Sequence, residues 1–125
     1  MPSLPEQVKA AWNDRDGAVV LATVDPQGVP NAIYATCVSL HGDDTVVIAD
    51  NYFNKTQQNI AAGSRGAVLF ITKQKKSFQV KGRIEYHTAG PVFDEMKGWN
   101  PSKYPGRAAA AIKAEEVYSG GNRLD

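Results

Sequence analysis

Residues 67–87 form the stretch AVLFITKQKKSFQVKGRIEYH, which indicates the class of fold more strongly than any other part of the chain. Ala67–Thr72 is an apolar run typical of a buried strand, and Lys73–Lys76 is a polar segment suited to a hairpin turn. Ser77–His87 then alternates apolar and polar side chains, as a returning strand does. The stretch therefore predicts two antiparallel strands joined by a tight turn.

Outward from this hairpin, the rest of the chain predicts a mainly β protein. Four more strands are expected at residues 18–24, 30–40, 45–49 and 107–118, and short helices at residues 4–15, 55–63 and 91–99. The run at 18–24 lacks clean alternation, which predicts a strand covered on both faces. Six strands joined mostly by tight turns favour a closed or partly closed β-barrel, with one domain spanning residues 1–125.

Composition excludes several classes of protein. The 125 residues are 42% hydrophobic and 22% charged, which is ordinary for a globular domain. Fourteen Lys and Arg against thirteen Asp and Glu leave a net charge of +1, which argues against a surface that follows a polyanion along its whole length. The single cysteine, Cys37, cannot form an internal disulfide. With no long apolar run and no visible signal peptide, we expect a cytoplasmic protein that binds no membrane.

The strongest local signal for a ligand is Asn54-Lys55-Thr56, which opens the predicted helix at 55–63 after a strand and an aromatic loop. The first turn of a helix has unpaired N–H groups, while Lys55 adds a charge and Thr56 a hydroxyl, so the segment suits a phosphomonoester. The same residues also suit a simpler role, in which Asn54 caps the helix and Lys55 stays in solvent. Taken alone, the three residues leave both interpretations open.

Motifs for the common nucleotide and hydrolase chemistries are missing from the sequence. The chain has no glycine-rich Walker or dinucleotide fingerprint and no G-x-S-x-G nucleophile. His41 and His87 stand at strand ends without a partner nucleophile, and Cys37 is expected to pack as a small apolar residue. We therefore expect neither a catalytic acid–base side chain nor a metal site.

Several short motifs occur in an order that resembles the pyridoxamine 5′-phosphate oxidase-like proteins, which are FMN-binding split β-barrels. They are a strand with Thr23, a Gly28-Val29-Pro30 turn, Asn54-Lys55-Thr56, a Lys81-Gly82-Arg83-Ile84-Glu85 strand, and Gly90-Pro91-x-Phe93 at a helix entry. The resemblance runs from about residue 18 to residue 117 and is strongest to the short members, the small FMN-binding proteins. It implies a homodimer of six-stranded split barrels of Greek-key type, with non-covalent FMN at the dimer interface and an oxidoreductase or electron-transfer function.

The resemblance also implies which residues bind the cofactor. Lys55 matches the lysine that holds the FMN phosphate, with Asn54 and Thr56 as its neighbours. The middle of the second strand is expected beside the flavin ring and its ribityl chain, and the end of the third strand is expected to offer backbone groups to the polar edge of the flavin. The fifth strand is expected to reach the phosphate or pyrimidine side, and an aromatic residue of a second subunit to close the site. The candidates in these four places are Tyr34, Ala35 and Thr36; Ala49, Asp50 and Asn51; Gln79 and Lys81; and Trp99 and Tyr104.

The chain departs from the true pyridoxamine phosphate oxidases in three places. Ile33-Tyr34-Ala35 lacks the arginine of their strand-two motif, and Asn54 stands where they have an arginine. Their substrate-binding Trp and Arg segment is not recognisable in residues 119–125. These departures argue against vitamin B6 oxidation, but FMN binding survives because Lys55 can still neutralise the phosphate. The substrate or redox partner stays open.

Two alternatives remain beside the flavoprotein. The basic turn Lys73–Lys76 lies near Phe70 and Phe78, and cations with aromatic rings suit a small barrel that binds single-stranded nucleic acid. A solvated hairpin turn explains the same residues more simply, so we expect no nucleic-acid partner. The second alternative is a split barrel that holds haem or a deazaflavin, because a fold alone does not fix a function.

Overall fold

The structure is a computed structural model that describes residues 3–125. Within that range the chain forms three helices and eight strands, which follow one another as α1 (Glu6–Asn13), β1 (Val19–Val24), β2 (Pro30–Ala35), β3 (Val38–His41), β4 (Thr45–Asp50), α2 (Lys55–Ala61), β5 (Arg65–Ile71), β6 (Ser77–His87), α3 (Pro91–Trp99), β7 (Ala108–Ser119) and β8 (Asn122–Arg123). Among these helices, none is long and apolar enough to cross a lipid bilayer.

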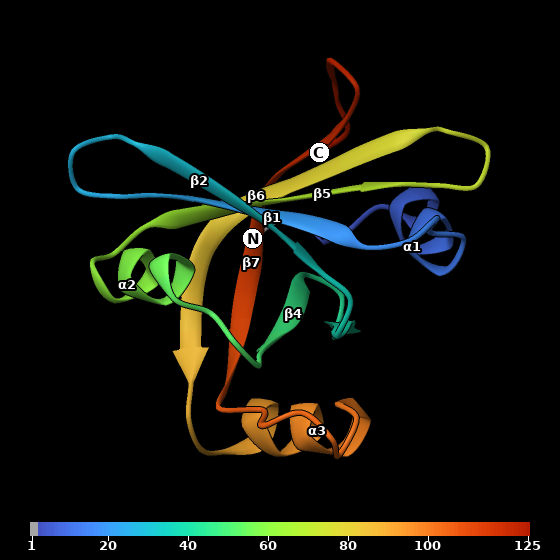
Figure 1. Ribbon diagram of the computed structural model, residues 1–125. Coiled ribbons are helices and arrows are strands. Elements are labelled where there is room, and N and C mark those ends of the chain that lie inside the picture. The colour runs from blue at the N-terminus through green and yellow to red at the C-terminus, as the bar shows by residue number, and fades with distance from the viewer. Residues whose placement is uncertain (1–2) are drawn as a thin grey trace.

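The strands form one antiparallel sheet whose two edges come together. Its order is β2-β1-β5-β6-β7-β4-β3, with β8 added beside β7. The edge strands β2 and β3 are consecutive in the chain and are separated only by Thr36 and Cys37, so the sheet has to curl on itself. Within residues 3–125 no ladder joins β2 to β3. The curled but open sheet, visible in Figure 1, confirms the predicted split-barrel fold.

Two predicted segments differ from the structure. The strand expected at residues 30–40 is broken at Thr36 and Cys37, because its first half pairs with β1 and its second half pairs with β4. The expected C-terminal tail contains β8, which folds back on β7 after a turn at Gly120, where φ is +57°. The described chain therefore has eight strands where six were predicted.

The main core fills the inside of the curled sheet and is closed by α1. Val8 and Trp12 of α1 are 1% and 5% exposed, and the Trp12 ring meets the Phe70 ring edge-on with centroids 5.2 Å apart. A second cluster lies on the other face of β4 and β7, where Met96 of α3 packs against small residues such as Ala109 and Ala111. Strand β4 is thus buried on both faces, and α3 closes the far end of the sheet in Figure 1.

Strand β1 is less covered than its sequence predicts. Val19 and Leu21 are fully buried in the core, whereas Val24 on the opposite face is 39% exposed. The prediction of a strand covered on both faces is therefore wrong for the single chain. The outer face of the sheet at β1 and β5 keeps apolar side chains in contact with solvent.

Gly66 and Gly82 face each other across β5 and β6. The ladder between β6 and β7 shifts register between Lys81 and Gly82. A Cβ atom built on Gly82 would lie only 1.7 Å from the carbonyl oxygen of Lys113. The close approach of two backbones at this point therefore requires glycine.

Candidate functional site

A cavity of about 630 Å³ lies beside the bend between the two edge strands. Its walls come from β2, the Thr36–Cys37 bend, the end of β4, the segment that leads into α2, and the loop between α3 and β7. This volume falls within the range of roughly 300–1,000 Å³ that is typical of small-molecule sites. Most of the predicted cofactor-binding residues line it, namely Tyr34, Ala35, Thr36, Ala49, Asn51, Asn54, Lys55, Thr56 and Tyr104.

Lys55 supplies the positive charge at the α2 end of the cavity. Helix α2 begins at this residue and has only seven residues, so its dipole is small and the side-chain charge matters more. Lys55 is exposed and forms no ion pair with any residue in 3–125. Its ammonium group is therefore available to an anion in the cavity.

Asn54 does not cap α2, although its position just before the helix suggested that role. No side chain among residues 3–125 accepts a capping hydrogen bond from the first N–H groups of the helix. Instead, Asn54 Oδ1 accepts from Gln58 Nε2 at 3.3 Å. The simpler interpretation of Asn54 as a helix cap is therefore wrong.

Thr56 is the buried hydroxyl at the same end of the cavity. Its side chain is 1% exposed, and its Oγ1 accepts a hydrogen bond from Asn31 Nδ2 at 3.2 Å. A second buried bond, from Asn59 Nδ2 to Thr23 Oγ1 at 3.0 Å, fixes the same helix to β1. These two bonds hold α2 against the sheet and set the place of Lys55 and Thr56.

Asp50 lies behind the cavity wall and not among the lining residues. Its buried carboxylate accepts from Arg107 Nη2 at 2.8 Å, from the Phe53 backbone N–H at 2.9 Å, and from the Tyr86 hydroxyl. Burial, followed by the bond to Asp50, raises the pKa of Tyr86 to about 12, and the same carboxylate raises the pKa of Arg107. This network fixes the turn after β4, which carries Tyr52 and Phe53 into the cavity wall.

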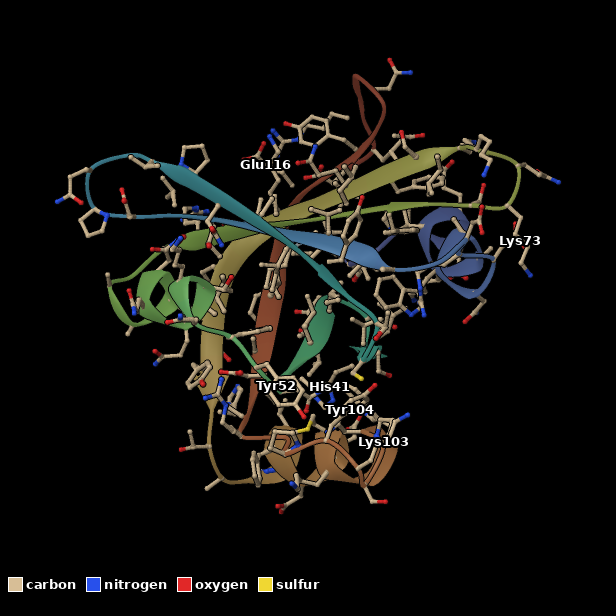
Figure 2. The ribbon with its side chains drawn as sticks, in the orientation of Figure 1. His41, Tyr52, Lys73, Lys103, Tyr104 and Glu116 are labelled. Carbon is tan, nitrogen blue, oxygen red and sulfur yellow. The ribbon has the colours of Figure 1, made fainter. Side chains whose placement is uncertain are left out.

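Asn51 holds the loop that closes the opposite side of the cavity. Its amide pairs reciprocally with the buried Asn100 amide at 3.0 and 3.2 Å, and its Oδ1 also accepts from the Gly106 N–H at 2.9 Å. The loop places the Tyr104 ring edge-on to Tyr52, with centroids 6.2 Å apart. Figure 2 shows these two tyrosines beside each other near α3.

Three further candidates lie away from the cavity. Gln79 and Lys81 are on the outer face of β6, where Lys81 Nζ stands 5.0 Å from the centre of the Tyr118 ring. Trp99 lines a smaller neighbouring hollow of about 370 Å³, which shares Thr36, Cys37 and Tyr104 with the main cavity. Within a single chain, these three residues do not join Lys55.

The cavity also contains five residues that sequence reasoning did not select, namely Asn31, Ile33, Cys37, Tyr52 and Phe53. Asn31 and Ile33 alternate with Ala35 along β2, so the two-residue period of a strand places all three on one face. Once Ala35 had been selected as a cofactor-binding candidate, this period could also have predicted Asn31 and Ile33. Tyr52 and Phe53 form the aromatic loop before α2, and bonds from distant residues to the Phe53 backbone and to Asp50 help to hold this loop at the wall.

The sequence matches the family model of pyridoxamine 5′-phosphate oxidase over residues 4–120. An uncharacterized protein of Methanocaldococcus jannaschii is 31% identical over 120 residues, which cover 91% of this chain and 78% of that protein. Among solved structures, HupZ from Group A Streptococcus has a TM-score of 0.84 at 21% identity, with 98% of each chain covered. An FMN-binding protein from Syntrophomonas wolfei has a TM-score of 0.80 at 21% identity, covering 96% of this chain and 87% of that one.

The same fold also occurs in proteins with other ligands in their names. An F420 reductase has a TM-score of 0.70 at 17% identity, covering 92% of this chain and 98% of that one. The haem storage protein HutZ from Vibrio cholerae has a TM-score of 0.69 at 15% identity, covering 94% and 95%. At these identities the likeness to solved structures shows the fold alone.

Proposed function

The chain belongs to the pyridoxamine 5′-phosphate oxidase family, and from that premise we propose that it is a flavoprotein that binds FMN non-covalently in the main cavity. The observation that carries the proposal is the convergence of Lys55 and Thr56 at one end of a cavity whose other walls are largely apolar or aromatic. FMN has the matching division into an anionic phosphate and a flat ring system.

The phosphate end of the cavity fits a dianion. Lys55 has no ion pair within residues 3–125, and Thr56 offers a buried hydroxyl beside it. Charge-assisted hydrogen bonds from such groups are about twice as strong as neutral ones. One lysine and one hydroxyl would thus give a chain of net charge +1 a local site for a phosphate.

The rest of the cavity fits the ring and its ribityl chain. Ile33 and Ala35 of β2 form an apolar wall, and Tyr52 with Tyr104 forms an aromatic one. Bound FMN would supply the redox chemistry, as transfer of a hydride or of single electrons. The protein side chains would orient the cofactor and set the electrostatics around it, so the protein would act as an oxidoreductase or as an electron carrier.

We further propose that a second copy of the chain completes the site. Tyr34, Val20 and Leu69 stand directly opposite one another on β2, β1 and β5, and so lie on one face of the sheet. On this outer face Tyr34 is 80% exposed, Leu69 43% and Val24 39%. Contiguous apolar surface of this kind marks interaction sites. Because Tyr34 also lines the cavity, a partner on this face would reach its mouth, and Gln79 lies in the same cross-strand row.

The visible spectrum of the purified protein, followed by titration with FMN, tests the cofactor. Flavin absorption bands and saturable FMN binding are expected, and Lys55→Ala should weaken FMN binding about tenfold or more, as the loss of a hydrogen bond to a charged group does. Lys73→Ala is the matched control, because Lys73 is an exposed lysine on the distant hairpin (Figure 2). Equal affinity of the wild type and Lys55→Ala would refute the phosphate assignment.

The same measurements separate the alternatives. A Soret band after addition of haem, or tight binding of a deazaflavin, together with no binding of FMN, would show that the cavity takes haem or a deazaflavin instead of FMN. The nucleic-acid alternative has weaker support, since Lys75 is paired with Asp16 at 2.7 Å and Lys76 stands over the Phe78 ring. A salt-dependent mobility shift of a labelled oligonucleotide in the presence of the protein would support the nucleic-acid alternative.

A further inference from the structure

Two buried hydrogen bonds of the same kind hold α2 to the sheet, but only one of them borders the main cavity. In each bond an asparagine amide donates to a threonine hydroxyl: Asn31 to Thr56 at 3.2 Å, and Asn59 to Thr23 at 3.0 Å. Thr56 is 1% exposed and Thr23 is 4% exposed. Asn31 and Thr56 both line the cavity, whereas Asn59 and Thr23 do not.

The bond from Asn31 determines what the Thr56 hydroxyl can still do. A hydroxyl has one proton to donate, and here its oxygen already accepts the Asn31 amide. Among residues 3–125 no acceptor receives the Thr56 proton. A buried donor without a partner is unfavourable, so an acceptor in the cavity would relieve it. Lys55, the next residue along α2, lines the same end and favours an acceptor that is negatively charged.

We propose that Asn31 is a positioning residue that keeps the Thr56 hydroxyl free to donate to the flavin phosphate, and that this pair gives the site a preference for FMN over riboflavin. The inference rests on the proposed FMN function. Asn31 touches Thr56 and need not touch the phosphate. Its amide nitrogen can only donate, so the hydroxyl oxygen stays occupied and its proton stays available.

An aspartate at position 31 reverses this arrangement with almost no change in size. A carboxylate can only accept hydrogen bonds, so the Thr56 hydroxyl would donate to the new carboxylate of the variant Asn31→Asp. The phosphate would then face a lone pair of the hydroxyl oxygen instead of its proton. It would also add a negative charge near the site. The test therefore has to separate loss of the hydroxyl donor from simple repulsion between the carboxylate and the phosphate.

The experiment measures the dissociation constants of FMN and riboflavin by quenching of flavin fluorescence, for the wild type and five variants. The two ligands differ only in the phosphate, so their ratio does not respond to a general loss of structure. We expect Thr56→Val to reduce the preference for FMN about tenfold or more, as loss of a hydrogen bond to a charged group does, and Thr56→Ser to keep it. Thr23→Val, which removes the equivalent buried bond away from the cavity, should leave the ratio unchanged.

Asn31→Asp should reduce the preference at least as much as Thr56→Val does. The double variant Asn31→Asp, Thr56→Val should lose little more of the FMN preference than Thr56→Val alone, because the effect of the aspartate on that preference passes through the hydroxyl. If the aspartate keeps its full effect without the hydroxyl, repulsion explains it and the inference is overturned. An FMN preference that does not respond to Thr56→Val or Asn31→Asp also overturns it, while the proposed function stands. Binding of neither flavin by the wild type would overturn both.

Discussion

Replacing Gly82 by alanine tests the most demanding feature of the fold, which is the close passage of β6 over β7. A Cβ at this position would lie 1.7 Å from the Lys113 carbonyl oxygen and 2.7 Å from its carbonyl carbon. Real Cβ atoms do not come closer than 3.0 Å, so the two strands would have to separate by about 1.3 Å, the difference between 3.0 and 1.7 Å. Both neighbouring atoms are backbone, and no side-chain rotation can relieve the overlap.

The cost of Gly82→Ala follows from that separation. Overpacking of a well-packed site costs about 1–3 kcal/mol, and each ladder hydrogen bond lost between β6 and β7 adds about 1 kcal/mol. With two of these ladder bonds lost, we expect the free energy of unfolding to fall by about 3–5 kcal/mol. Because domains of this size are stable by only about 5–15 kcal/mol, a large part of the stability would be lost.

Urea unfolding followed by tryptophan fluorescence measures this loss, and two glycines serve as controls. A Cβ on Gly66 would meet the flexible end of Ile84 at 2.7 Å, so Gly66→Ala should cost only about 1 kcal/mol. A Cβ on Gly98 in α3 would meet nothing within 4 Å, and Gly98→Ala should stabilise the protein by about 0.5–1 kcal/mol. If Gly82→Ala costs no more than Gly66→Ala, the argument from the backbone contact is wrong.

Three further predictions concern the Asp50 network, the proposed dimer and the proposed chemistry. The pKa of Tyr86 is raised from 10.0 to about 12, so its contribution to stability is present below pH 10 and lost as the pH rises through about 12. Tyr86→Phe should lower the free energy of unfolding by about 2 kcal/mol at pH 7 and reduce its decrease between pH 10 and 12. If the urea midpoint of the variant falls with pH as steeply as that of the wild type over this range, the prediction is wrong. Leu69→Glu should place a charge on the outer sheet face and convert a dimer to a monomer, as measured by sedimentation velocity, and an unchanged mass would exclude this face. With FMN bound, oxidation of NAD(P)H in the presence of an acceptor would identify an oxidoreductase, whereas reversible reduction without turnover would identify a carrier.

The elements with a strong local pattern were predictable from the sequence. The hairpin of β5 and β6 lies where the alternation and the polar turn placed it, and the expected strand at 77–87 matches β6 to the residue. Helix α3 also begins at Pro91 and ends at Trp99 as expected, since proline favours a first helical turn. In these segments local signals and tertiary packing agree.

The differences arise where distant residues determine the structure. Nothing in residues 30–40 marks the break at Thr36 and Cys37, because it exists only when β1 and β4 take opposite halves of the segment. Asp50 was expected to offer backbone groups to the flavin, and nothing in the sequence indicated that Tyr86 and Arg107, both far away in the chain, hold its carboxylate behind the wall. The two-residue period of β2 could have pointed to Asn31, but its bond to Thr56, on another element, could not be predicted from the sequence.

The pairing of β4 has a consequence for synthesis of the protein on the ribosome. All six residues of β4 are buried, and its sheet neighbours within residues 3–125 are β3 and β7 alone. Its long partner, residues 108–113, is synthesised well after β4, because α2, β5, β6 and α3 lie between them in the chain. Until then the nascent chain exposes an apolar strand with an unpaired edge, which is the form most prone to associate with other chains. We therefore expect premature termination before residue 108 to give aggregated fragments rather than a smaller folded barrel.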